Sequence, residues 1–162
     1  MNDLITPDWV AREAEDLRNR EYERENEKLQ RLLLQKADKA DGPEYRKELA
    51  KEIAIGAESC AVLGITGTAE SISEQVGETP KTAGVRFTLT LRGIPNRSRS
   101  TNVYIRDNEL VVRCFSEAEE EEKLYFCVSD SGDLRLRING SLLSSKEAAA
   151  FIVRREYKRL NG

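Results

Sequence analysis

The amino-acid sequence predicts an α+β protein, and three observations carry that prediction. The first 62 residues contain two stretches with helical spacing of apolar residues, residues 84–138 contain runs in which apolar and polar side chains alternate, and a helix-like segment ends the chain. Spacings of three and four residues indicate amphipathic helices, whereas alternation indicates strands with one buried face. We therefore expect an N-terminal helical hairpin (a long helix plus a shorter helix), a five-stranded antiparallel meander sheet, and a C-terminal helix packed on the sheet.

The first predicted helix runs from Trp9 to about Ala37, because this stretch contains no glycine or proline. Most of it is too polar to be buried along its whole length in one small core. One register places residues at the a and d positions of heptads, with two asparagines at a, which favours a two-stranded parallel coiled coil. These candidate self-association residues are Asn19, Tyr22, Asn26, Leu29 and Leu33.

The heptad pattern leaves an alternative open, because only about two and a half heptads fit and Lys36 falls at the next d position. Coiled coils are identified more safely from three or four sustained heptads. In the alternative, the helix is solvated and only its leucine-rich end packs on its own domain. That end contains Leu29, Leu32, Leu33 and Leu34.

Residues 38–43 (DKADGP) predict the end of the long helix, and Pro43 predicts the start of a second one. Small and aliphatic residues recur at helical spacing across residues 44–62, so a short helix is expected there. Residues 64–83 are rich in glycine, serine and threonine, which is typical of a linker. The predicted organisation is a helical arm or hairpin at 1–63, a linker at 64–83, and the sheet with the C-terminal helix at 84–162.

The spacing of apolar residues changes to two at Gly84, where the first strand is expected. Polar, turn-forming stretches then separate further apolar runs and predict two hairpins. The C-terminal helix begins with Ser144 and Glu147, which have the spacing of a capping box. The five expected strands are Val85–Leu91, Asn102–Ile105, Leu110–Phe115, Lys123–Val128 and Leu134–Ile138.

Composition limits the chemistry that the chain can perform. It has 162 residues, of which 39% are hydrophobic and 34% charged, with a net charge of −3 and no histidine. This length fits one ordinary domain with or without a helical arm. Without histidine, Ser-His and Cys-His nucleophiles and imidazole-ligated metals are excluded. We expect no enzyme, no catalytic residues, no cofactor and no metal.

The three cysteines, Cys60, Cys114 and Cys127, form neither a CxxC motif nor an even set. A disulfide framework and a zinc knuckle are therefore not indicated. The N-terminal residues lack the pattern of a signal peptide, and no run of about 18 apolar residues occurs. We expect a cytoplasmic protein that does not associate with membranes, with Cys114 and Cys127 packed as small apolar side chains.

Charge is unevenly distributed along the predicted sheet. Residues 83–115 contain six arginines and two acids, a net of +4, whereas residues 116–143 contain three basic and seven acidic residues, a net of −4. Arginine guanidiniums suit phosphate or carboxylate, so arginines of the first half and of the final helix are candidates for binding an anion or a partner. These candidates are Arg86, Arg92, Arg97, Arg99, Arg154 and Arg155.

Two observations weigh against a nucleic-acid interface at these arginines. They can simply be solvated, or paired with acids such as those of the run Glu119–Glu122, which itself is expected to be a solvated turn. The outward positions of the first strand, Arg86 to Arg92, also carry no aromatic residue for base stacking. Phosphate contacts without base reading remain compatible with the pattern.

The sequence therefore predicts a non-enzymatic cytoplasmic interaction or assembly protein. It self-associates through its N-terminal helix as a homodimer or higher homo-oligomer, and it contacts another protein or other macromolecule through the charge-segregated sheet half. The alternative is a nucleic-acid-associated regulator that grips phosphates through the Arg92–Arg99 loop and the basic C-terminal helix.

Overall fold

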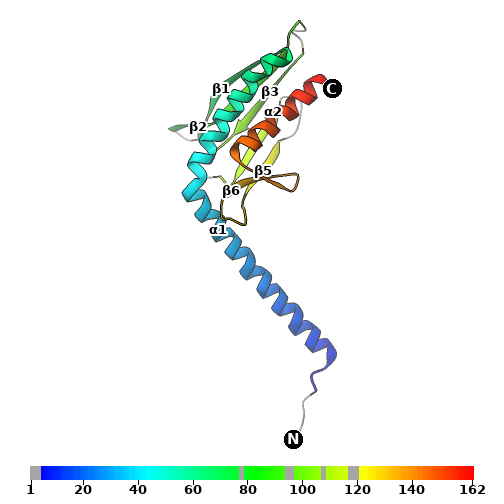
Figure 1. The fold of residues 1–162 in the computed structure, drawn as a ribbon. Coiled ribbons are helices and arrows are strands. Elements are labelled where there is room, and N and C mark those ends of the chain that lie inside the picture. The colour runs from blue at the N-terminus through cyan, green and yellow to red at the C-terminus, as the bar shows by residue number, and fades with distance from the viewer. Residues whose placement is uncertain (1–4, 77–78, 94–96, 107–108, 117–120) are drawn as a thin grey trace.

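The computed structural model describes residues 5–76, 79–93, 97–106, 109–116 and 121–162, with the side chains of residues 74–83 outside this description. The architecture is α+β, as predicted (Figure 1). The elements in chain order are α1 (Asp8–Ser59), a short 3-10 helix (Cys60–Leu63), β1 (Ile65–Val76), β2 (Thr79–Leu91), β3 (Ser98–Tyr104), β4 (Val111–Ser116), β5 (Glu122–Val128), β6 (Leu134–Ile138), β7 (Ser141–Leu143) and α2 (Ser145–Asn161).

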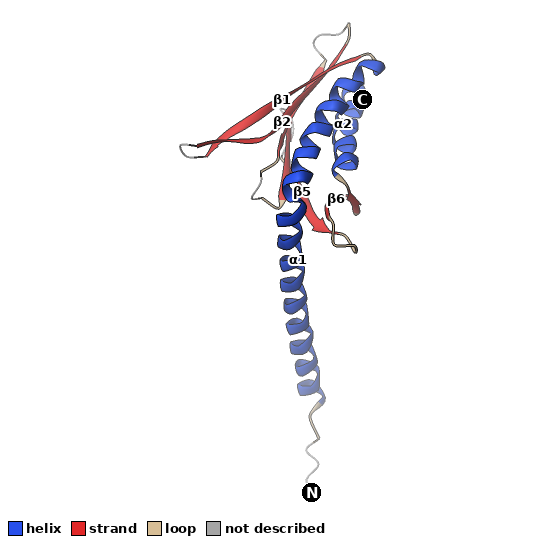
Figure 2. Cartoon of the chain, turned by 60° about the vertical axis from the view of Figure 1, so that its left-hand side comes forward, coloured by secondary structure: helices blue, strands red, loops and turns tan. Residues whose placement is uncertain are grey.

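The seven strands form one antiparallel sheet in the order of the sequence, so each strand pairs with its neighbour in the chain. The C-terminal part of α1 and the whole of α2 lie side by side against the same face of the sheet (Figure 2). The C-terminal helix therefore packs on the sheet as predicted, but it shares that face with α1. The opposite face, here called the open face, is not covered by either helix.

The sheet has two more strands than predicted. The five expected strands are present, extended or shifted at their ends, but β1 and the first part of β2 occupy residues 64–83, which were predicted to be a linker. The apolar alternation that signals a strand is weak in β1 because the inward positions after Ile65, Gly67 and Ala69, are small. At Gly67 an added Cβ would collide with the carbonyl oxygen of Ala57, so α1 packs directly on the backbone of β1. The other additional strand is β7, of three residues.

The predicted helical hairpin is wrong, because α1 continues through Pro43 as one helix of 52 residues. Gly42 does not end the helix; it leaves room for an ion pair beside it. Arg46 Nη1 lies 2.7 Å from Asp38 Oδ1, and a Cβ on Gly42 would collide with both side chains. Arg46 Nη2 also donates to the carbonyl oxygen of Glu109 at 2.6 Å. Tertiary contacts thus hold the helix together where proline removes one backbone hydrogen bond.

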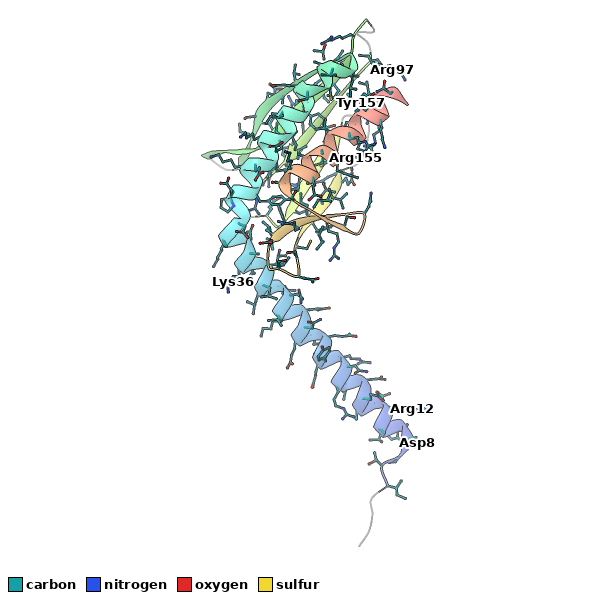
Figure 3. All side chains as sticks on the ribbon, in the orientation of Figure 1. Asp8, Arg12, Lys36, Arg97, Arg155 and Tyr157 are labelled. Atoms are coloured by element: carbon teal, nitrogen blue, oxygen red, sulfur yellow. The ribbon has the colours of Figure 1, made fainter. Side chains whose placement is uncertain are left out.

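The helix α1 consists of two parts with different surroundings. Residues 8–36, here called the arm, extend away from the sheet, and the helix changes direction beyond Lys36 (Figures 1 and 3). From residue 8 to residue 33 every side chain except the half-buried Val10 is exposed. The first buried residue of the helix is Ala37. Residues 37–162 are here called the body.

The core of the body lies between the covered face of the sheet and the two helices. Leu49 and Ile53 of α1 meet Phe87 and Leu89 of β2 in one continuous cluster of buried side chains, which also includes Ile152 of α2. Tyr45 fixes the start of this packing, because its hydroxyl donates to the carbonyl oxygen of Leu143 at 2.9 Å and its ring meets Phe126 edge-on at 5.3 Å between centroids.

The predicted capping box of α2 is confirmed. The amide of Glu147 donates to Ser144 Oγ at 3.3 Å, and the amide of Ser144 donates to Glu147 Oε1 at 3.1 Å. Among the described residues, no helix combines the length and apolar composition that crossing a bilayer requires.

Candidate functional site

The predicted arginine loop is folded against the end of α2. Arg97 Nη2 donates to the carbonyl oxygen of Gly162 at 2.9 Å, and Arg99 Nε lies 2.9 Å from Glu156 Oε2. Figure 3 places the labelled Arg97 beside the C-terminal end of the chain. The two segments of the nucleic-acid alternative, the loop and the final helix, are therefore close together. Arg97 and Arg99, however, make these contacts within the chain.

Glu156 lies at the centre of a buried ionic cluster between β3 and α2. Its side chain is only 1% exposed, and its carboxylate receives Arg99 on one oxygen and Arg159 Nη1, at 3.0 Å, on the other. Arg155 Nε lies 3.8 Å away. A buried carboxylate is tolerated only when it is paired, so these arginines stabilise the packing of α2 on the sheet.

The remaining candidate arginines are distributed over three places. Arg155 pairs with Glu122 and lies with its guanidinium 5.6 Å from the ring centre of Phe151. Arg86 lies on the open face, where Nε donates to Asn102 Oδ1 at 2.7 Å and Nη1 lies 3.4 Å from Glu70. The other two, Arg92 and Arg154, are exposed. The six predicted residues therefore do not form one site.

Residues of opposite charge that are separated along the chain form ion pairs in the folded protein. Arg113 of β4 lies 3.5 Å from Glu121, which precedes β5, and Arg155 reaches Glu122. Acids at the start of the acidic half of the sheet thus meet a basic residue of the preceding half, Arg113, and one of the final helix, Arg155. Most of the acidic turn, residues 117–120, lies outside the described residues.

The cysteines are placed as packing residues. All three are free thiols, with Cys60 and Cys114 buried and Cys127 half-buried. Burial raises the pKa of the Cys114 thiol to about 12, so this group is protonated and unreactive at neutral pH. The cavity beside it, lined by Thr101, Ser116 and Arg155 among others, measures about 10 Å³, enough for about one water molecule.

Two larger depressions lie on the helical side of the body. One of about 460 Å³ lies between α1 and the β1–β2 hairpin, and its basic residues include Lys47 and Lys51. The other, of about 520 Å³, follows α2 along Leu143, Phe151 and Arg154. Within the described ranges, no group of three or more cysteines, aspartates and glutamates is arranged to hold a metal ion.

The open face carries a set of side chains that the sequence analysis did not single out. Phe115 of β4 is 47% exposed and Tyr125 of β5 is 60% exposed, although both lie between buried neighbours in their strands. Basic residues from β4, β5 and β6 share this surface. We call it the open-face patch and define it by Tyr104, Arg113, Phe115, Lys123, Tyr125 and Arg137.

The alternation of apolar and outward-facing residues in 111–115 and 123–127 was enough to predict these exposed rings. It places Phe115 opposite in direction to the apolar Cys114, and Tyr125 opposite to Leu124 and Phe126. The outward positions of the first predicted strand carry no aromatic residue, whereas those two and three strands further along carry Phe115 and Tyr125.

Comparisons with known proteins add no family. No family model matches the chain, and no curated protein or solved structure is significantly similar to it.

Proposed function

We propose that this chain is a non-enzymatic assembly protein that self-associates through the arm and presents the sheet of the body to a macromolecular partner. The observation that supports this most directly is the amount of exposed surface. The chain exposes 11436 Å², whereas a compact monomer of 18.3 kDa exposes about 8,100 Å² by the scaling of surface with mass. The excess of this one chain is roughly 3,300 Å², about four times the roughly 800 Å² that each partner contributes to a standard protein interface.

The arm contributes apolar side chains to this exposed surface. In proteins most helical stability comes from the packing of an apolar face rather than from propensity, and residues 8–33 are exposed except for the half-buried Val10. Of the leucine-rich end only Leu34 packs against the core, which leaves Leu29, Leu32 and Leu33 exposed. All five candidate self-association residues are exposed. A second copy of the arm would cover the stripe that they form. Two of its a positions, Asn19 and Asn26, carry asparagine, which favours a dimer in one register.

The test is the mass of the full-length chain in solution, measured by size-exclusion chromatography with light scattering. Tyr22→Glu combined with Leu29→Glu places charge at two d positions and should convert the dimer or oligomer to a monomer. Leu17→Glu is the matched control, because Leu17 is an equally exposed arm leucine that lies outside the a and d positions. The control should keep the wild-type mass.

A monomeric wild-type chain at tens of micromolar would contradict self-association. Equal dissociation by the control and by the double variant would also contradict it, because the heptad stripe would then have no special role. Far-ultraviolet circular dichroism of each variant verifies that the body is folded.

A further inference from the structure

The open-face patch is built in three rows that cross the strands. Antiparallel pairing sets Asn102 opposite Phe115 in the first row. The second row runs from Tyr104 through Arg113 to Lys123. Rows on one face are two residues apart along a strand, which is about 6.8 Å.

The third row passes from Val111 through Tyr125 to Arg137. Each of the three rows therefore holds one aromatic ring, and the second and third rows also hold cations beside it. Rings and cations are therefore neighbours over β3 to β6. Neither helix covers this face of the sheet (Figure 2).

The electrostatics of the patch favour an anion. Arg113 and Lys123 are directly opposite each other on neighbouring strands, and like charges in such a pair destabilise a sheet unless a counter-charge is present. Arg113 has partial compensation, since Glu109 Oε2 and Glu121 Oε1 both lie 3.5 Å away. Lys123 is exposed at the other end of the row.

The aromatic residues distinguish among anionic partners. Cations alone would suit any acidic partner, whereas rings set beside cations match the stacking surfaces on which single strands bind. Bases of a single strand stack on such rings, and their phosphates need cations between the rings. Arg113 already lies over Tyr104, with its guanidinium 5.8 Å from the ring centre, and this plane is itself a surface on which a base can stack.

We propose that the open-face patch binds single-stranded nucleic acid, with bases stacked on Phe115 and Tyr125 and phosphates held by Arg113, Lys123 and Arg137. This proposal specifies the partner of the sheet in the proposed function. It differs in position from the nucleic-acid alternative of the sequence analysis, which used the Arg92–Arg99 loop and the final helix.

The experiment is fluorescence anisotropy of the full-length chain with labelled 15-nucleotide oligothymidine, oligouridine and a 15-base-pair duplex at two salt concentrations. The single strands should bind more tightly than the duplex. Phe115→Ala and Tyr125→Ala should each weaken single-strand binding about tenfold, as expected for the loss of one stacked base. Lys123→Gln should reduce the salt dependence by about 0.7 in the log–log slope.

One further variant should strengthen binding instead of weakening it. Glu121→Gln removes a carboxylate that competes with phosphate for Arg113, so it should tighten binding severalfold. Trp9→Ala and Lys39→Gln are the matched controls, an exposed ring on the arm and an exposed cation of α1, and both should bind as the wild type does. Phe115 and Tyr125 are exposed, so their removal should leave the body folded, as circular dichroism will verify.

Three results would overturn the proposal. The first is no binding of either single strand at low salt, and the second is wild-type binding by both Phe115→Ala and Tyr125→Ala. The third is a loss of binding with Arg154→Gln but not with Lys123→Gln, which would place the anion on the helical side. If the chain self-associates but fails these tests, the proposed role of the arm stands and the nucleic-acid site is wrong. If the chain is a monomer that binds oligonucleotides, only self-association through the arm is contradicted.

Discussion

The arm and the body contain parts of the same helix but derive their order from different sources. In the body, α1 presents Leu49, Ile53 and Ala57 to a closed core. In the arm, the same helix carries charge on most of its surface and has no layer of side chains against it. Helical propensity is thus sufficient to predict both parts, whereas only packing explains why the body part is stable. A continuous helix can therefore join a region that is packed on a core to one that is not.

The largest expected difference comes from removing one core side chain. Phe87 is completely buried under both helices, so Phe87→Ala should lower the free energy of unfolding by about 3–5 kcal/mol. Urea denaturation followed by circular dichroism measures this change. Trp9→Ala, which truncates an exposed ring of the arm, should leave the urea midpoint of the body nearly unchanged. Similar losses in both variants would refute the division into arm and body.

The buried ionic cluster should have the second-largest effect. Glu156→Ala removes the buried carboxylate that Arg99 and Arg159 share, which should cost about 2 kcal/mol, the scale for losing hydrogen bonds to a charged group. Urea midpoints again give the comparison. Glu23→Ala removes a carboxylate from the exposed arm and serves as the control, with little expected change. An equal midpoint for the two variants would show that Glu156 contributes no more than a surface charge.

A smaller effect is expected at the start of α2. Ser144→Ala removes the side-chain acceptor of the capping box and should cost about 1 kcal/mol. Ser144→Thr keeps the hydroxyl and should recover most of the loss. Because α2 closes the core of the body, the change should be visible in the thermal midpoint of the whole body. A variant as stable as the wild type would mean that the cap is dispensable.

The smallest expected effect concerns pH. Two hydrogen bonds with Ser144 lower the pKa of Glu147 below the ordinary value of 4.5. The backbone amide of Ser144 makes the larger contribution and its side chain the smaller one. A group whose pKa is lower in the folded state stabilises the fold above its unfolded pKa and loses this contribution as the pH falls through the folded value. Glu147→Gln should therefore be less stable than the wild type at pH 7, and the difference should shrink as the pH falls below the ordinary value of 4.5. A difference independent of pH would contradict this assignment.

The fold was predictable where the local signal and the tertiary structure agree. The alternating strands from Val85 onward and the capping box at Ser144 are such places. The continuous helix was not predictable, because Gly42 and Pro43 break helices locally and only the contacts of Arg46 with Asp38 and Glu109 outweigh that tendency. β1 was not predicted for a related reason. Its glycine at position 67 is required by the close approach of α1, and this contact between distant segments cannot be read from the residues of the strand alone.

The candidate site was predictable only in part. Sequence reasoning identified the residue types that could bind an anion, but it could not determine that Arg99 would reach Glu156, 57 positions further along the chain. It could have identified the exposed rings, because period-two alternation alone assigns Phe115 and Tyr125 to the open face. The self-association of the arm remains a prediction, and its residues are accessible to a partner.

The packing of α1 on α2 also fixes an order of events during translation. Helix α2 is made after all seven strands, yet its residues complete the core that α1 and the sheet begin. The core of the body thus cannot close during synthesis until the 17 residues of α2 have left the ribosome, long after the arm has emerged. Arms of two chains growing on neighbouring ribosomes are therefore available to each other before either body has folded.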